Sequence, residues 1–288
     1  MFRRFDNRFW AFVLVVVFGW TASVSVAQEF RIDTDIYVGK QTKPVAHTVT
    51  LFDGEMIYDF KLSEDPNVDV TEVVIFNGRT REFILLDPSR KIQLTIQQSQ
   101  LLEIVEGSRL YAAQKKESSF FVNDKFTESF DIGKNEITVQ SPHFKYVVKG
   151  SQPKNVQVMP KYGEFLNQFT RLKATDPHGD PPFVRLKVNE SIKKFGWLPT
   201  EIQVTKNLPN MKRPIVLASR HTLINQLSDQ DKVRIDKAKK SWLTFKAATL
   251  ATYRNIPVAP KARDAGSGQK TLTNQRSATN TNTGSNKK

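Results

Sequence analysis

Cysteine is absent from this chain of 288 residues. The absence excludes disulfide bridges, thiolate metal sites, cysteine nucleophiles and a lipid attached to an N-terminal cysteine. Histidine is scarce, with four residues that lie far apart in the sequence: His47, His143, His178 and His221. Zinc motifs that place two histidines on one helix face are therefore missing, and the chain must assemble any histidine pair by folding.

Familiar catalytic and phosphate-binding motifs are missing as well. The sequence contains no Gly-x-Ser-x-Gly, Gly-x-Gly-x-x-Gly or Gly-x-x-x-x-Gly-Lys-[Ser/Thr] pattern. Serine-elbow hydrolases and these types of nucleotide cradle are therefore excluded. Asp176, His178 and Asp180 could hold a divalent cation on a loop. Their Pro- and Gly-rich context favours instead a helix connection in which Asp180 caps the next helix. We predict no catalytic residue, no metal ion and no cofactor.

Two further charged groups have ordinary explanations. Glu55 and Asp59 share one side of a strand pattern with Asp53 nearby, and paired carboxylates can do acid–base work. Strand spacing also places exposed charges there by default, which is the interpretation we favour. The basic stretch Lys237–Lys240 beside Trp242 has the composition of a nucleic-acid contact, but it also fits a solvated helix face.

The first 27 residues have the features of an export signal. Arginines precede an unbroken apolar run, Phe9–Phe18, and small residues follow it. Ser25 and Ala27 fit the −3 and −1 positions of a signal-peptidase site, which predicts a signal peptide of residues 1–27. The alternative is an uncleaved anchor, because Phe9–Ala27 carries no charge and nearly reaches the ~20 residues that span a bilayer. Both interpretations predict export, to the periplasm, the cell envelope or the medium, and the second adds attachment to the inner membrane through residues 9–27.

The other end of the chain has the composition of a disordered tail. Residues 258–288 are rich in Gly, Ser, Thr and Asn and carry six basic residues against one acidic residue. Such a segment cannot offset the entropy lost on folding. Its charge could bring it to an anionic envelope surface, although a solvated tail is the simpler interpretation. Residues 28–257 remain as a single domain, which is long enough to bury one core.

Alternating apolar and polar residues dominate the first part of that domain. The pattern runs through residues 30–38, 45–51 and 56–62, which predicts half-buried antiparallel strands. Asn77-Gly78 is a strong hairpin signal. After a helix around residues 101–112, the alternation resumes with strands at Phe120 and Val122 and ends with a short strand at Val156 and Val158.

The rest of the domain is expected to hold three helices, with a strand at Ile202 and Val204 and another at Ile215–Leu217 before the last of them. Apolar stripes predict one helix over residues 162–172 and another over 184–195, the second between Pro182 and Gly196. A capping-box pattern at Ser228 and Asp231 begins a third, long helix. Because strands and helices do not alternate regularly, the predicted class is α+β. We expect a mainly antiparallel curved sheet, with a half-barrel as one form of it, and helices packed on one face.

Phenylalanine is unusually frequent, with 20 residues, and many of them occupy alternate strand positions. An ordinary core explains this pattern most simply. The sharper hypothesis is a concave apolar face that helices only partly cover and that holds an acyl chain or an apolar segment of a partner. The candidate ligand-binding residues are Tyr58, Phe60, Phe83, Leu85, Phe144 and Tyr146.

Three stretches carry a resemblance to known proteins: FRIDTDIYVGKQTKPVAHTVTLFDGEMIYDF, REFILLDPSRKIQLTI and PPFVRLKVNESIKKFGWLPTEI. Over about Phe30–Thr205, the chain resembles a family of uncharacterised exported proteins common in planctomycete bacteria. That family has no assigned activity, so the resemblance transfers no functional residue. More loosely, the order of elements is similar to periplasmic lipoprotein-carrier half-barrels, in which helices lid the barrel and acyl chains bind. The second likeness concerns architecture alone.

These observations favour an exported, non-catalytic protein of the cell envelope that binds a lipid, an acyl chain or a protein partner through its curved sheet. The export signal argues against nucleic acid as a partner. The alternative is a secreted hydrolase with an unrecognised active site, which a polar pocket with converging carboxylates would favour. A scaffold that acts through its basic tail is a third interpretation.

Overall fold

A computed structural model describes residues 29–256, except for residues 66, 157, 178 and 210. The expected signal segment, the expected basic tail and His178 of the metal candidate lie outside the described residues. None of the helices in the described ranges combines the length and apolar character needed to cross a bilayer.

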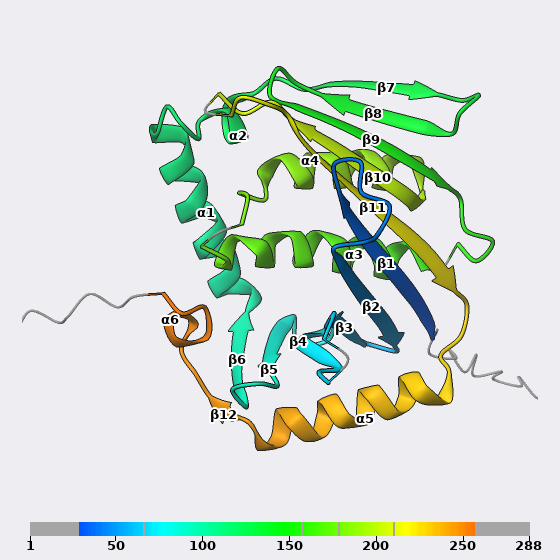
Figure 1. Cartoon of the computed structure of the whole chain (residues 1–288), viewed down its shortest axis with the longest axis vertical. Helices are drawn as coiled ribbons and strands as arrows, with labels where there is room; N and C mark the ends of the chain where they lie inside the picture. Colours follow the sequence, from blue (N-terminus) through cyan, green and yellow to red (C-terminus); the bar gives the residue numbers. More distant parts are fainter. Residues whose placement is uncertain (1–28, 66, 157, 178, 210, 257–288) are drawn as a thin grey trace, which may run out of the picture. The chain divides into compact units, whose positions relative to one another are not determined.

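One mainly antiparallel sheet contains all the strands described, in the order β12-β6-β5-β4-β3-β2-β1-β11-β10-β9-β8-β7. The strands are β1 (Phe30–Val38), β2 (Ala46–Asp53), β3 (Met56–Leu62), β4 (Val70–Asn77), β5 (Glu82–Asp87), β6 (Ile92–Gln97), β7 (Thr127–Asp131), β8 (Glu136–Gln140), β9 (Phe144–Ser151), β10 (Leu198–Lys206), β11 (Ile215–Ile224) and β12 (Lys246–Ala247). Among the strands that the structure describes, only β12 and β6 pair in parallel. Figure 1 shows that the sheet curls but stays open, with β7 and β12 at its edges.

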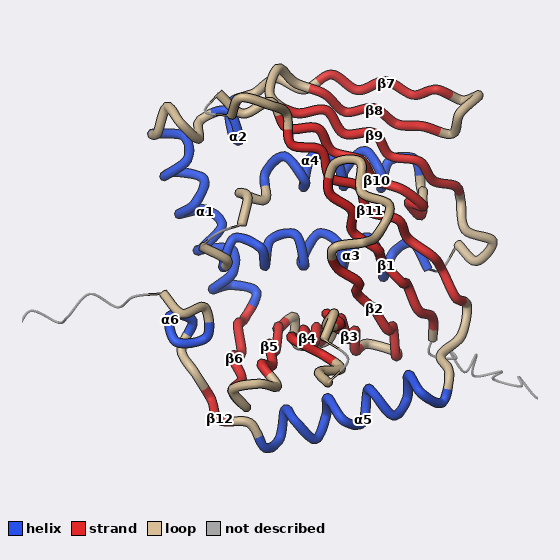
Figure 2. Tube along the Cα trace, in the orientation of Figure 1, coloured by secondary structure: helices blue, strands red, loops and turns tan. Residues whose placement is uncertain are grey.

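Helices connect and cover these strands. They are α1 (Gln98–Gln114), α2 (Phe120–Asn123), α3 (Val158–Leu172), the 3-10 helix η1 (Lys173–Thr175), α4 (Phe183–Phe195), α5 (Asp229–Thr244) and α6 (Leu250–Tyr253). Figure 2 separates the strands from the helices by colour and shows α3 and α4 crossing the sheet together. The predicted α+β class with a mainly antiparallel curved sheet is confirmed.

The middle of the sheet joins distant parts of the sequence. Strand β1 pairs with β11 in an antiparallel register that runs from Arg31 opposite Ile224 to Val38 opposite Leu217. This pairing connects the meander β1–β6 to the strands β7–β11. No local pattern in the sequence predicts it, because the two strands lie almost the whole domain apart.

The two faces of the sheet have different covers. On the inner face, which bears Ile32 and Phe144, residues of β1–β6 pack against α1 and α3, and residues of β8–β10 pack against α4. On the outer face, which bears Leu51 and Tyr58, residues of β2–β5 pack against α5. The prediction that helices pack on one face only is therefore wrong, because α5 covers the other face as well.

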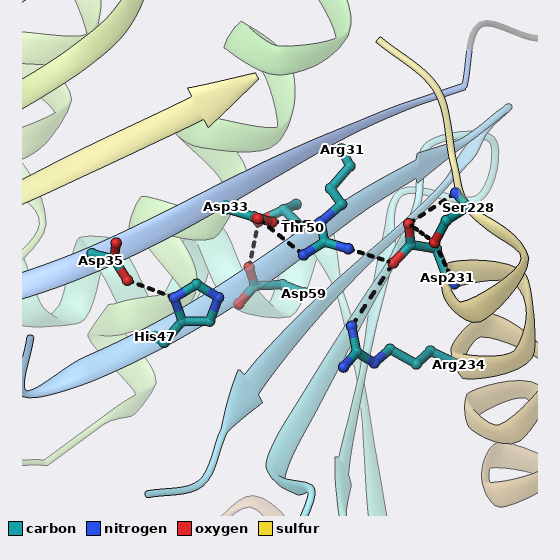
Figure 3. Close-up of polar contacts among 9 residues, drawn as sticks. All are labelled: Arg31, Asp33, Asp35, His47, Thr50, Asp59, Ser228, Asp231 and Arg234. Carbon is teal, nitrogen blue, oxygen red and sulfur yellow. Dashed lines mark hydrogen bonds and ion pairs between the residues drawn. The ribbon is translucent and has the colours of Figure 1, made fainter. Parts of the chain in front are cut away.

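Ion pairs hold the beginning of α5 on the outer face, as Figure 3 shows. Asp231 is only 1% exposed, and its side chain accepts from the backbone nitrogen and the hydroxyl of Ser228 in the predicted capping box. The Arg31 guanidinium of β1 donates to Asp231 over 2.9 Å, and Arg234 lies 3.8 Å away. The helix start is thus tied both to its own first turn and to a central strand.

Two predicted strands are wrong. Phe120 and Val122 belong to the short helix α2, in which Asn123 and Asp124 donate backbone hydrogen bonds to Ser119 and Phe120. Two apolar residues spaced two apart are too short a pattern to separate a strand from one helical turn.

The second wrong strand lies before α3. Val156 precedes the helix and is 66% exposed, whereas Val158 is its first residue and is buried. The apolar stripe of α3 extends back through Tyr162 to Val158 at a spacing of four residues, which is a helical period.

Candidate functional site

A cavity of about 660 Å³ lies against the inner face of the sheet. Central strands, helices α3 and α4 and the loop between these helices line it. Its volume falls within the roughly 300–1,000 Å³ that is usual for small-molecule sites. The residues that form its apolar part are mainly aromatic or branched: Phe121, Phe144, Tyr146, Tyr162, Phe165, Leu166, Phe169, Ile202 and Val204.

Small side chains on the central strands help to create this space. The inner face holds two separate hydrophobic clusters, one built on β1–β6 with α3 and one built on β8–β10 with α4. Between them, β1, β2 and β11 present short side chains, among them Thr34, Thr48 and Ser219. Ile36 and Leu217 of the same strands also reach the cavity, so the short side chains account for part of the hollow between the two clusters.

His221 forms part of this polar floor. Its Nδ1 lies 2.9 Å from Oγ1 of Thr34 on the neighbouring strand, and its Nε2 lies 3.0 Å from Oγ of Ser219. Burial, together with the charge of Arg185, lowers the pKa of His221 to about 4. The imidazole is therefore neutral at neutral pH, with one ring nitrogen donating to a hydroxyl and the other accepting from one.

Asp59 is the carboxylate buried in the cavity wall. It is 7% exposed, and the Thr50 hydroxyl donates to it over 2.6 Å (Figure 3). Burial raises the pKa of Asp59 to about 6, and the Thr50 hydrogen bond and the charge of Lys173 only partly oppose that rise. The expectation of an exposed strand charge is wrong here, because an inward position of β3 lies beneath the helices. Glu55 lies in the preceding turn, exposed, 3.8 Å from Lys161.

Ion pairs occupy other parts of the lining. Lys206 pairs with Asp180, and Arg254 lies 3.2 Å from Glu72. The prediction that Asp180 caps α4 is wrong: Pro182 is the N-cap residue, and it makes no side-chain capping bond. The buried ammonium group of Lys206 at the end of β10 engages the carboxylate instead.

The candidate ligand-binding residues divide among three places. Phe144 and Tyr146 on β9 line the cavity. Phe83 and Leu85 on β5 belong to the inner-face core, away from the cavity lining. The remaining two, Tyr58 and Phe60, face the other way and pack beneath α5. The structure therefore brings two of the six together at the cavity, and a binding role for them stays a prediction.

Sequence reasoning missed the polar floor and Arg185. Thr34 and Ser219 are ordinary strand residues, and only the β1–β11 pairing brings them to the two sides of His221. The scarcity of histidine in the sequence was the one signal that could have drawn attention to His221. Within the described part of the chain, no three His, Asp or Glu side chains form a group that could hold a metal ion.

Comparisons with known proteins give weak likenesses. The chain matches no family model and no curated protein. Two crystal forms of PNGF-II align with 80% of this chain, at 11% and 10% identity and TM-scores of 0.32 and 0.31. The chain spans about a third of the length of PNGF-II, 33% and 32% in the two forms.

A third structure is the LolA superfamily protein NE2245 from Nitrosomonas europaea. It aligns with 71% of this chain and 90% of its own, at 9% identity and a TM-score of 0.28. Likenesses at this level support no inference about activity or ligand. The resemblance to exported planctomycete proteins stays a prediction, and the cavity itself has to support any proposed function.

Proposed function

We propose that this chain is an exported, non-catalytic protein of the cell envelope that binds a lipid or another ligand with an acyl chain. The cavity of about 660 Å³, with its predominantly aromatic and branched apolar lining, is the observation that carries the proposal. The export part rests on the apolar run and the small-residue stretch of residues 9–27. A protein partner at the same cavity would have to insert an apolar segment.

Uptake of a fluorescent fatty acid by the purified protein tests the proposal. Native mass spectrometry of protein purified from the envelope gives an independent measurement, because a retained lipid adds its mass. A clean apo mass together with no uptake would contradict lipid binding.

A cavity-filling variant sharpens this test. Thr48 lies on β2 in the cavity lining, so Thr48→Phe places a ring in the space that a ligand would occupy. Thr222→Phe is the matched control, because Thr222 on β11 is exposed and absent from the lining. Both variants keep residues that strands favour. We expect uptake to fall at least tenfold in the first variant and to stay unchanged in the second.

A hydrolase is the second candidate, because Ser219 and His221 lie within hydrogen-bond distance in the cavity. Two features make this pair a poor catalyst. The other nitrogen of His221 meets the Thr34 hydroxyl and no carboxylate, and a pKa of about 4 makes the imidazole a weak base. Labelling by a fluorophosphonate probe, lost in Ser219→Ala, would support the hydrolase; we expect no labelling.

A further inference from the structure

Arg185 is a charged side chain of the cavity lining that lacks a protein partner. It lies in the first turn of α4 and is half-buried. Among the described residues, it makes no hydrogen bond and no ion pair. A guanidinium group removed from bulk water without a counter-charge is unfavourable, so this position is better suited to a protein with a ligand bound than to an empty one.

Two tyrosine hydroxyls of the cavity lining also lack a protein partner among the described residues. Tyr146 on β9 is 8% exposed and Tyr162 on α3 is 5% exposed, and both line the cavity. Neither hydroxyl has a hydrogen-bond partner in the part of the chain that the structure describes. Burial raises the pKa of both to about 12, and the positive charge of Arg185 acts against that rise in each case. Both groups therefore stay protonated and can donate hydrogen bonds.

The acidic residues of the lining leave these donors free. Glu72 pairs with Arg254, Asp180 pairs with Lys206, and Asp59 accepts from Thr50. Asp176 is the fourth carboxylate of the lining, and it has an interaction of its own. Lys61 and Lys173 also line the cavity, and neither forms an ion pair within the described part of the chain. Since His221 is neutral near pH 7, five cationic side chains stand against four carboxylates among the described residues of the lining, an excess of one positive charge.

We infer that Arg185, Tyr146 and Tyr162 bind the anionic head group of an amphiphile whose apolar chain fills the rest of the cavity. The head group is a carboxylate or a phosphate ester, because a guanidinium fork matches the geometry of both. This inference rests on the proposed function, in which the cavity holds an acyl chain, and it adds a selection for negatively charged ligands over neutral ones.

Paired probes test this selection. The first pair is 1-pyrenedodecanoic acid and its methyl ester, which share the chain and differ in the charge of the head. At pH 7.5 the wild-type protein should bind the acid about tenfold to a hundredfold more tightly than the ester, the range expected for hydrogen bonds to a charged group. Competition between dodecanoate and dodecyl phosphate for the same site then distinguishes a carboxylate ligand from a phosphate ligand.

Substitutions locate the charge recognition. Arg185→Gln should reduce the affinity for the acid by at least tenfold and leave the affinity for the ester unchanged, whereas Arg185→Lys should retain part of the preference. Tyr146→Phe and Tyr162→Phe should each reduce the affinity for the acid about threefold to tenfold. The matched control is Arg220→Gln, because Arg220 on β11 is exposed and absent from the cavity lining. Thermal melting of each variant separates lost binding from lost folding.

The outcomes distinguish this inference from the proposed function. Equal affinity for acid and ester, unchanged in Arg185→Gln, would overturn the anion site while leaving an apolar cavity that binds acyl chains. Failure of the wild-type protein to bind either probe would overturn both. A preference for the acid that Arg185→Gln leaves intact would place the charge recognition elsewhere and would also contradict the inference.

Discussion

The two halves of the sheet, which meet at the β1–β11 pairing, differ in how their strands are buried. In β4, four consecutive residues, Val73–Phe76, are buried, and Phe83–Leu86 of β5 repeat this pattern. In β9, buried residues alternate with exposed or half-buried ones. The first pattern occurs where α5 covers the outer face and other helices cover the inner face. The comparison shows that a continuous apolar run in a strand indicates that both faces of the strand are packed against other elements. A strict alternation indicates that only one face is packed.

The cavity lies where these two arrangements meet. Large apolar side chains fill the inner face on both sides, and the short, polar side chains of β1, β2 and β11 lie between them. A protein that only needed a stable core would fill this position with larger residues. The hollow is therefore the part of the inner face whose composition the core does not explain, and this is why the proposed function and the anion site are both placed there.

The largest effect is expected where α5 is fixed over the doubly covered half of the sheet, strands β2–β5, which helices cover on both faces. Asp231→Ala removes the buried carboxylate between Arg31, Arg234 and Ser228, and it leaves the partly buried charge of Arg31 without that partner. Because Arg31 keeps its hydrogen bonds to Asp33, the expected cost is that of a lost helix cap and a lost charged hydrogen bond, about 2–4 kcal/mol. Asp229→Ala, in the same first turn but exposed, is the control. Urea unfolding measures both, and a loss below about 1 kcal/mol for Asp231→Ala would show that α5 docks without this contact.

The next effect concerns the carboxylate in the cavity wall. The pKa of Asp59 is about 6 in the folded protein against 3.8 for the free group. Because the folded protein holds this proton more tightly than the unfolded chain, the associated stability is present at low pH and is lost as the pH rises through about 6. Asp59→Asn keeps the acceptor for Thr50 but cannot ionise. We expect it to be more stable than the wild type by up to about 3 kcal/mol at pH 7.5, with the difference shrinking toward pH 4.5.

Unfolding in urea at several pH values between 4.5 and 7.5 measures this trend. Asp69→Asn serves as the control, because Asp69 is exposed and its charge costs nothing to keep in water. A constant difference between Asp59→Asn and the wild type over this range would contradict the raised pKa.

Much of the fold can be predicted from local patterns, and most of the site cannot. Period-two alternation identifies the strands of the meander, and the left-handed Gly196 and the Ser228–Asp231 capping box mark helix ends as expected. Phe120–Val122 and Val156–Val158 fail because two apolar residues do not define a period. The floor of the cavity depends on the β1–β11 register, which a pairing between distant segments sets. For the same reason, nothing local predicts which aromatic residues reach the cavity and which pack beneath α5.

Two valines, one in each half of the sheet, test whether the halves differ in the stability that the same side chain contributes. Val49 on β2 and Val147 on β9 both lie on the outer face. Val49 is fully buried beneath α5, whereas Val147 is only half-buried. Val49→Ala should cost about 2 kcal/mol, from two methyl groups removed from a packed core. Val147→Ala should cost about 0.5 kcal/mol, since its side chain is already partly in water. Equal losses in urea unfolding would show that the cover by α5 does not set the difference between the halves.

Effects of about 1 kcal/mol are expected at two tyrosines, and they should have opposite signs. Tyr58 is fully buried beneath α5, and its hydroxyl has no hydrogen-bond partner in the described structure. Tyr58→Phe removes this unsatisfied group and keeps the ring, so it should stabilise the protein by about 1 kcal/mol.

Tyr253 of α6 is the matched comparison. It is equally well buried, but its hydroxyl donates to Glu72 over 3.2 Å. Tyr253→Phe removes that bond and should destabilise the protein by about 1 kcal/mol. Differential scanning calorimetry of the two variants measures both shifts against the wild type. A destabilised Tyr58→Phe would mean that the hydroxyl finds a partner, such as a trapped water molecule, beneath α5, and the outer layer of the doubly covered half would then be less dry than its side-chain packing indicates.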